Sequence, residues 1–244
     1  SDIRAVDTKP ITDWYQSFKG AENQILDLKL LDSAKKATRD RQYVFNLAAD
    51  MGGMGFIENH KADCMLSVLI NTHMLEAAKE YGVERFFFAS SACVYNGDKQ
   101  DTPDVVALKE SDAYPALPED GYGWEKLFSE RMVRHFQEDF GIKGRVARYH
   151  NVYGPEGTWV GGREKAPAAL SRKVAEAVIS GNHKIDIWGD GEQTRSFTYI
   201  DDTILGTQLL FWSDFDEPLN IGSDELVSIN QLVTLLEGIS GIKL

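Results

Sequence analysis

Short apolar runs alternate along the first 150 residues with longer stretches in which apolar residues recur every three or four positions. The runs are rich in β-branched and aromatic residues, and several lack alternation, which is typical of strands buried on both faces. They are IRAVD from Ile3, YVFNLA from Tyr43, RFFFAS from Arg85 and RVARYH from Arg145, with a further strand expected near Leu26. Strands separated by helices need right-handed crossovers, so the pattern predicts an α/β fold with a doubly wound, mostly parallel sheet.

Two helices in this part have well-marked ends. His60 to Tyr81 carries apolar side chains at spacings of three and four, and Gly82 follows as a C-terminal cap would. A second helix is predicted from Tyr122 to Phe140, with Gly141 ending it.

The pattern changes after Tyr149, so we divide the chain into residues 1–150 and 151–244. The segment HNVYGPEGTWVGGREKAP is too long to be an ordinary connection. The elements predicted after it are a helix near Pro167 to Ile179, strands in KIDIWG and FTYI, a helix from Asp201 to Phe211, a strand in PLNIG, and a helix capped by Ser228.

Asp7 is placed as an acidic residue would be at the end of the second strand of a dinucleotide-binding fold. Such an acid holds the ribose hydroxyls, and about 20 residues before it come a strand and a G-x-G-x-x-G turn. Neither precedes Asp7 in these 244 residues. In the strand order 3-2-1-4-5-6 the missing strand is central, so we expect a space of about 10 Å between IRAVD and YVFNLA, or a strand from elsewhere that fills it. Residues 1–150 are therefore predicted to be a Rossmann-type NAD-binding domain without its first βα unit.

Composition narrows the class of partner. Lys and Arg number 26 and Asp and Glu 38, giving a net charge of −12, which argues against a nucleic acid or an anionic membrane as the main partner. Two cysteines are too few for a disulfide framework or a cysteine zinc cluster, and no metal site is predicted. No apolar run approaches the roughly 20 residues of a membrane-spanning helix, and the first residues lack the features of a secretory signal. We expect a cytoplasmic protein.

The strongest chemical signal is the sequence Tyr122-Gly123-Trp124-Glu125-Lys126. Positions i and i+4 share a helix face, and a phenol beside an ammonium loses its proton more easily, as removal of an alcohol proton during hydride transfer requires. The spacing alone fits a solvated pair equally well. The catalytic interpretation gains weight from the strand that ends in Ser90 and Ser91, because ligands bind at the carboxyl edge of such sheets.

The segment INTHMLEAAKEYGVERFFFASSACVY, followed by Tyr122 and Lys126, resembles the extended short-chain dehydrogenase/reductase family of nucleotide-sugar enzymes. Within that family, the stretches similar to GDP-mannose 3,5-epimerases are NLAADMGGMGF, SSACVY, HNVYGPEGTWVGGREKAP, WGDGEQTRSFTYID and NIGSDELVS. The resemblance implies NAD as cofactor, GDP-mannose as substrate, GDP-L-galactose and GDP-L-gulose as products, and a homodimer. Residues 151–244 would then be a smaller, truncated nucleotide-sugar-binding region, interleaved with the first domain.

The resemblance also implies catalytic roles by position. Tyr122 would take the proton of the sugar 4-hydroxyl while NAD accepts the hydride. Lys126 would hold the cofactor ribose and lower the pKa of Tyr122, and Ser91 would hydrogen-bond the same hydroxyl. Cys93 and Lys165 would be the acid/base pair on opposite faces of the sugar, because a transient 4-ketone acidifies the hydrogens at carbons 3 and 5.

The other candidate residues bind cofactor or substrate. Those for the cofactor are Asp7, Asp27 and Ala48, together with Tyr122 and Lys126. Those for the substrate are Gly52, Ser91, Cys93, Asn151, Glu164, Lys165, Lys173 and Arg195, with Arg163 and Arg172 as alternatives for the diphosphate. Cys64, in the middle of an apolar helix face, is interpreted as a packing residue.

Two other functions stay open. One is a related NAD-dependent 4-epimerase or 4,6-dehydratase, against which Cys93 together with Lys165 argues, because neither reaction needs that pair. The other is a nucleotide-sugar-binding fragment or pseudoenzyme without activity. The intact residues Tyr122, Lys126, Cys93 and Lys165 weigh against it.

Overall fold

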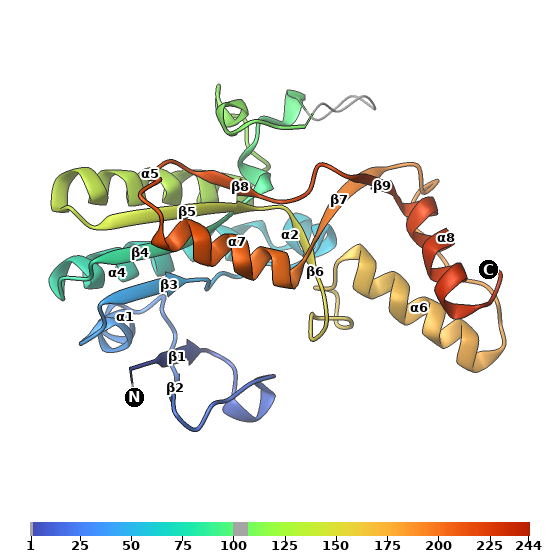
Figure 1. The fold of residues 1–244 in the computed structure, drawn as a ribbon, viewed down its shortest axis with the longest axis horizontal. Helices are drawn as coiled ribbons and strands as arrows, with labels where there is room; N and C mark the ends of the chain where they lie inside the picture. Colours follow the sequence, from blue (N-terminus) through green and yellow to red (C-terminus); the bar gives the residue numbers. More distant parts are fainter. Residues whose placement is uncertain (1, 100–106) are drawn as a thin grey trace.

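The computed structural model describes residues 2–99 and 107–244, and the strands of this part form two-, four- and three-stranded sheets (Figure 1). Their orders are β1-β2, β3-β4-β5-β8 and β6-β7-β9, and every pairing is parallel except that of β7 with β9. The strands are β1 Arg4–Asp7, β2 Glu22–Ile25, β3 Tyr43–Asn46, β4 Arg85–Ser91, β5 Lys143–Tyr149, β6 Asn151–Tyr153, β7 Thr194–Tyr199, β8 Leu219–Ile221 and β9 Leu226–Ser228.

Helices cover both faces of the four-stranded sheet. The α-helices of the described residues are α1 Leu31–Thr38, α2 Met54–Asn59, α3 Lys61–Met65, α4 Ser67–Glu80, α5 Tyr122–Phe140, α6 Ala166–Ser180, α7 Ile200–Trp212 and α8 Ile229–Ser240. Of these, α6 and α8 lie away from this sheet and pack against each other (Figure 1). Phe86 and Phe88 of β4 pack in one core cluster with residues of α4 and α5, whereas Phe87 packs in another with Phe211 of α7. The uninterrupted apolar run is thus explained by burial on both faces, and the predicted doubly wound α/β fold is confirmed.

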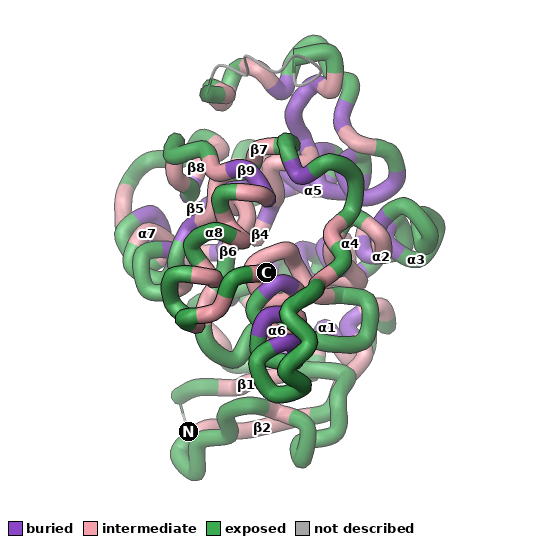
Figure 2. Tube along the Cα trace, turned by 90° about the vertical axis from the view of Figure 1, so that its right-hand side faces the viewer, coloured by how far each residue is buried: buried purple, intermediate pink, exposed green. Residues whose placement is uncertain are grey.

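The two N-terminal strands form a sheet of their own, and IRAVD does not pair with YVFNLA among the described residues. Figure 1 shows β1 and β2 beyond the β3 side of the larger sheet, and Figure 2 shows both strands with intermediate or exposed residues along their whole length. The side chains of Tyr43 and Phe45 on β3 are exposed, although both residues are large and apolar. The prediction that these two runs are not direct neighbours is confirmed.

Helix ends follow the sequence signals closely. α5 has the predicted bounds, and Gly141 caps it in the left-handed conformation at φ 73°. Ser228 caps α8 in a capping box with Gln231. The helix predicted over His60 to Tyr81 is interrupted at Leu66, which separates α3 from α4.

The strand predicted in KIDIWG is wrong. The carbonyl groups of this segment accept hydrogen bonds from side chains, Asp186 from Lys173 and Trp188 from Gln193, instead of from a neighbouring strand. No helix in residues 2–99 and 107–244 has both the length and the apolar character that crossing a bilayer requires.

Candidate active site

A short turn at the end of β4 brings Ser91 and Cys93 together. Ser91 is the last residue of β4 and the N-cap of the 3-10 helix Ala92–Val94, and its Oγ accepts a hydrogen bond from the Cys93 amide at 3.2 Å. Since β3, β4 and β5 are parallel, this turn lies at the carboxyl edge of the sheet, where α/β folds bind ligands. The strand therefore ends in a hydroxyl and a thiol on one turn.

The start of α5 lies directly against this turn because position 123 is glycine. A Cβ atom on Gly123 would lie 2.3 Å from the carbonyl oxygen of Cys93, so no side chain fits there. The same carbonyl accepts a hydrogen bond from the Glu119 amide at 3.0 Å. Tyr122, the first residue of α5, consequently shares a small apolar cluster with Cys93.

Tyr122 and Lys126 lie on one face of α5, as their spacing predicts. Lys126 Nζ is 5.4 Å from the centroid of the Tyr122 ring and 4.7 Å from that of Phe88. Both Tyr122 and Lys126 are buried. Burial lowers the pKa of Lys126, and the nearby carboxylate of Glu125 opposes that shift.

The pKa of Tyr122 differs from the expectation that Lys126 would lower it. Burial raises the pKa of the phenol above its usual value, and charge at Cys93 and Glu125 adds to the shift, while hydrogen bonding to Ser91 opposes it. Burial is the largest cause of this shift, because it disfavours the charged phenolate. Glu125, whose Oε2 is 3.5 Å from the Lys126 ammonium, acts in the same direction as burial.

Glu125 is a buried ionisable residue that sequence reasoning missed. Only 3% of its surface is exposed, and burial raises its pKa. Its Oε1 accepts a hydrogen bond from Ser129 Oγ at 2.9 Å, whereas Oε2 is buried without a hydrogen bond. The available signal was its spacing, since position i+3 from Tyr122 lies close to the same helix face.

Lys165 lies close enough to Cys93 for their charges to interact. It is half-buried as the N-cap residue of α6, at the end of the long segment that follows β6. Burial lowers the pKa of Lys165 and raises that of Cys93 to about 12, and each charge partly offsets the shift of the other. The Glu119 carboxyl, which the sequence pattern did not single out, adds to the rise at Cys93. Ser91, Cys93 and Tyr122 thus lie together, with Lys165 within electrostatic reach of Cys93, and a shared catalytic role for the four residues stays a prediction.

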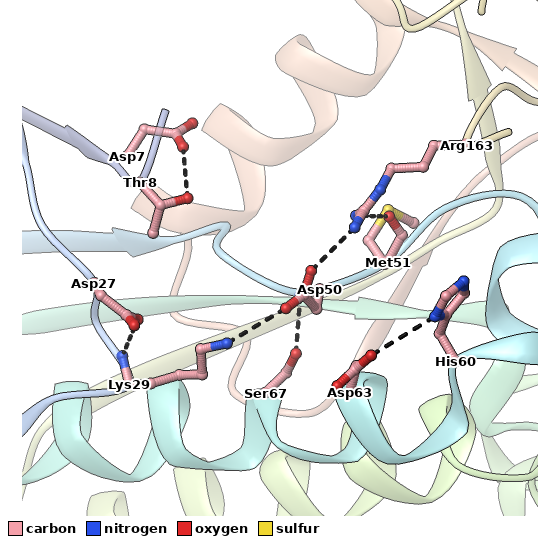
Figure 3. A network of polar contacts seen from close by, with 10 residues as sticks. All are labelled: Asp7, Thr8, Asp27, Lys29, Asp50, Met51, His60, Asp63, Ser67 and Arg163. Carbon is pink, nitrogen blue, oxygen red and sulfur yellow. Dashed lines mark hydrogen bonds and ion pairs between the residues drawn. The ribbon is translucent and has the colours of Figure 1, made fainter. Parts of the chain in front are cut away.

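The cofactor candidates lie at strand ends. Asp7 ends β1 and Asp27 follows β2, and these strands are parallel, so both carboxylates lie at one edge (Figure 3). Asp7 Oδ1 accepts from the Lys9 amide at 3.0 Å, and Asp27 Oδ1 accepts from the Lys29 amide at 2.9 Å. Within the described part of the chain, the second oxygen of each carboxylate accepts no hydrogen bond, which fits binding of ribose hydroxyls. Ala48, just after β3, is half-buried against the main core.

Three of the nucleotide candidates belong to the second part of the chain. Asn151 begins β6 and donates to the Ser196 carbonyl of β7 at 3.2 Å, and Arg195 on β7 donates to the Thr194 carbonyl at 2.7 Å. Lys173 of α6 lines a cavity of about 340 Å³ with Arg172 and Lys184. Their convergence on the cluster of Ser91, Cys93 and Tyr122 stays a prediction.

Gly52 and Glu164 lie where two loops touch. A Cβ atom on Gly52 would lie 2.7 Å from the Cβ of Phe56 and 3.2 Å from the Cγ of Arg163. Glu164 Oε2 accepts a hydrogen bond from the Gly162 amide at 2.7 Å, and Glu164 Oε1 is 3.9 Å from Arg172. Cys64 is fully buried next to Tyr122, in agreement with its interpretation as a packing residue.

Comparisons with known proteins match most of the chain. The NAD dependent epimerase/dehydratase family matches residues 3–222. A protein named GDP-mannose 3,5-epimerase 1 from Oryza sativa subsp. indica is 52% identical over 216 residues, 88% of this chain and 56% of that protein. GDP-mannose 3,5-epimerase from Arabidopsis thaliana is 50% identical over the same shares. The chain therefore spans little more than half the length of these relatives.

Solved structures of nucleotide-sugar enzymes have the same fold. UDP-glucose 4-epimerase from Thermotoga maritima with UDP-glucose superposes with a TM-score of 0.83 at 25% identity, covering 98% of this chain and 74% of that one. UDP-glucuronic acid 4-epimerase from Bacillus cereus, in complex with UDP-glucuronic acid and NAD, gives a TM-score of 0.73 at 28% identity, covering 92% and 67%.

Proposed function

The chain belongs to the NAD dependent epimerase/dehydratase family, and from this membership we propose that the protein containing it is a GDP-mannose 3,5-epimerase. It converts GDP-mannose to GDP-L-galactose, with GDP-L-gulose as a second product, and uses NAD. The observation that carries this proposal is the Cys93 thiol beside Tyr122, with Lys165 within electrostatic reach of that thiol, because epimerisation needs a proton donor and a proton acceptor near the sugar ring. The sequence identity of 50–52% to enzymes of that name supports it.

The first step is oxidation of carbon 4. NAD, when bound, supplies the hydride acceptor and a positively charged ring. Tyr122 accepts the proton of the 4-hydroxyl as a phenolate, a form that the positive charge of this ring would favour against the effect of burial, and Ser91 orients that hydroxyl. Lys126, held under the Tyr122 ring, binds the cofactor ribose, and the carboxylates of Asp7 and Asp27 accept hydrogen bonds from the adenosine half.

The second step is proton transfer at carbons 3 and 5. The ketone at carbon 4 acidifies both positions, so a weak base suffices to remove each hydrogen. Burial favours the neutral thiol of Cys93 and the neutral amine of Lys165, which provides one proton donor and one acceptor for the first carbon. That inversion leaves an ammonium and a thiolate, and proton exchange with water restores the neutral pair before the second carbon reacts. Return of the hydride to carbon 4 then restores the alcohol, so cofactor is not consumed.

The substrate nucleotide is assigned to residues 151–244. Lys173 and Arg195 supply cations for the diphosphate, Asn151 supplies an amide, and Gly52 and Glu164 border the sugar from the two touching loops. The cavity that Lys173 shares with Arg172 and Lys184 is also lined by Glu176 and Asp186, and Arg172 is paired with Glu176, so the sequence similarity supports this assignment.

Incubation of the complete protein with GDP-mannose in deuterated water tests this function. We expect deuterium at carbons 3 and 5 of the sugar, measured by mass spectrometry and NMR, with no net change in the ratio of NAD to NADH. A parallel incubation with UDP-glucose separates the alternative. Formation of UDP-galactose without deuterium uptake would contradict the proposal in favour of a 4-epimerase, and no turnover of either sugar would favour the binding protein.

We further propose a homodimer that joins through α3, α4 and α5. Apolar side chains on the outer side of these adjacent helices are exposed, namely Met65, Leu66, Leu69, Trp124 and Phe128. Phe128→Glu is expected to convert the dimer to a monomer in sedimentation experiments, because a buried unpaired carboxylate is strongly unfavourable. Leu209→Glu on α7, an even more exposed apolar site on the other face of the sheet, serves as control. A dimer that survives the first substitution but not the second would contradict this interface.

The cytoplasm remains our proposed location. Cys93 acts in this mechanism as a thiol, and reducing compartments keep exposed and half-buried thiols reduced.

A further inference from the structure

Two loops that are far apart in the sequence contact each other through their backbones. The Gly53 amide, in the segment MGGM after β3, donates a hydrogen bond to the Arg163 carbonyl in GGREKAP at 3.1 Å. A Cβ atom on Gly53 would lie 2.7 Å from the Glu164 carbonyl oxygen, so the approach requires glycine at this position. The first loop therefore contacts the backbone of residues 163 and 164 directly.

The side chain of Arg163 extends the contact onto the first loop. Its guanidinium donates to the Met51 carbonyl at 2.9 Å and to Asp50 Oδ1 at 3.3 Å, as Figure 3 shows, and lies 3.8 Å from the centroid of the Phe56 ring. One side chain therefore makes a hydrogen bond, an ion pair and a cation–π contact, all with residues 50–56.

Asp50 is itself fixed by other parts of the fold. Its amide donates to Ser67 Oγ at 2.9 Å, and its second carboxylate oxygen is 3.4 Å from Lys29 Nζ. Ser67 begins α4, and Lys29 follows the cofactor candidate Asp27 (Figure 3). Arg163 therefore binds Asp50, a residue that contacts from Ser67 and Lys29 already hold in place.

The segment that carries Arg163 has little regular structure of its own. Residues 154–165 form no helix or strand, and Gly154, Gly161 and Gly162 have positive φ angles. Residues 155–163 are exposed. Lys165 follows Arg163 by two positions and directly precedes α6, so the loop ends in the lysine assigned to proton transfer.

We propose that Arg163 is a positioning residue that clamps this loop onto residues 50–56 and thereby holds Lys165 against Cys93. The inference deepens the proposed function and rests on it for the role of Lys165, whereas the clamp itself rests on the contacts above. Arg163 was one of the alternatives for the substrate diphosphate. Its guanidinium is instead engaged by Asp50, Met51 and Phe56.

The test compares Arg163→Ala with Arg163→Lys, which keeps the charge but loses the planar fork. Arg134→Ala is the matched control, because Arg134 also forms ion pairs with two carboxylates, Glu138 and Glu217, but on the distant α5 surface. The first readout is the rate at which a pulse of acetylating reagent modifies Lys165, measured by mass spectrometry. The second readout compares the rate of deuterium exchange at carbons 3 and 5 with the rate of hydride transfer at carbon 4.

Arg163→Ala is expected to raise the acetylation rate of Lys165 several-fold and to lower carbon-bound exchange about 10²-fold, because a displacement of about 1 Å can cost that much. In Arg163→Ala, hydride transfer and the KM for GDP-mannose stay near the wild-type values. Arg163→Lys recovers part of the deuterium exchange, and Arg134→Ala leaves the acetylation rate and the exchange rate unchanged. Unchanged acetylation, or an equal loss of hydride transfer and exchange, would overturn the inference. Absence of exchange in the wild type would refute the proposed function instead. The difference in the Lys165 acetylation rate between Arg163→Ala and Arg134→Ala would then still test whether Arg163 holds the loop in place.

Discussion

Tyr122→Phe is expected to abolish hydride transfer, and with it every later step. The substitution removes the only atom of this side chain that can accept the 4-hydroxyl proton, and the loss of a general base typically lowers the rate 10²–10⁴-fold. The ring keeps its apolar cluster and its contact with Lys126, so the free energy of unfolding should change little. Stopped-flow absorbance of the reduced nicotinamide after mixing with GDP-mannose measures the step, and chemical denaturation measures the stability.

Tyr81→Phe is the matched control, because its hydroxyl accepts a hydrogen bond from Arg39 at 3.3 Å, but on the surface. It should leave hydride transfer unchanged. Hydride transfer at the wild-type rate in Tyr122→Phe would show that another group takes the proton. The buried Glu125 would then be the first residue to examine, because its raised pKa makes it a better base than an exposed carboxylate.

Cys93→Ala is expected to leave oxidation at carbon 4 intact while lowering deuterium exchange at carbons 3 and 5 by about 10²–10⁴-fold. Lys165→Ala should give the same separation, with NAD still bound. Cys93→Ser should be nearly as poor as Cys93→Ala, because a hydroxyl is a much weaker acid than a thiol, whose unperturbed pKa is about 8.5. NMR of the recovered sugar in deuterated water measures exchange, and nicotinamide absorbance measures oxidation.

The second cysteine provides the control for the thiol chemistry. Cys64 is fully buried next to Tyr122, so Cys64→Ala should lower stability by creating a small cavity but keep exchange at both carbons. If Cys93→Ala retained wild-type exchange at both carbons, the thiol would be structural and the proposed mechanism wrong.

Local patterns predicted those parts of the fold that depend on local physics. The bounds of α5 follow from its apolar spacing and from Gly141, and the run Phe86–Phe88 is apolar because the sheet buries it on both faces. The separation of β1 from β3 followed from a rule of strand order applied to Asp7. KIDIWG was assigned wrongly because alternation cannot tell whether a partner strand exists.

Burial and contacts between distant segments were out of reach of such patterns. Spacing alone placed Glu125 near the helix face of Tyr122, but the burial of Glu125 beside its sequence neighbour Lys126 comes from the packing of α5. The direction of the Tyr122 pKa shift depends on that packing. The proximity of Lys165 to Cys93 was expected only from family resemblance, because no periodicity connects an irregular loop to a strand end.

The glycine at position 123 has a consequence for redesign of the enzyme. Because a Cβ atom there would lie 2.3 Å from the Cys93 carbonyl oxygen, any larger residue would force the first turn of α5 away from the turn after β4. That shift would move the phenol of Tyr122 relative to the thiol of Cys93. Substitutions intended to admit a bulkier sugar are therefore better placed in the lysine-bearing loop, with glycine kept at position 123.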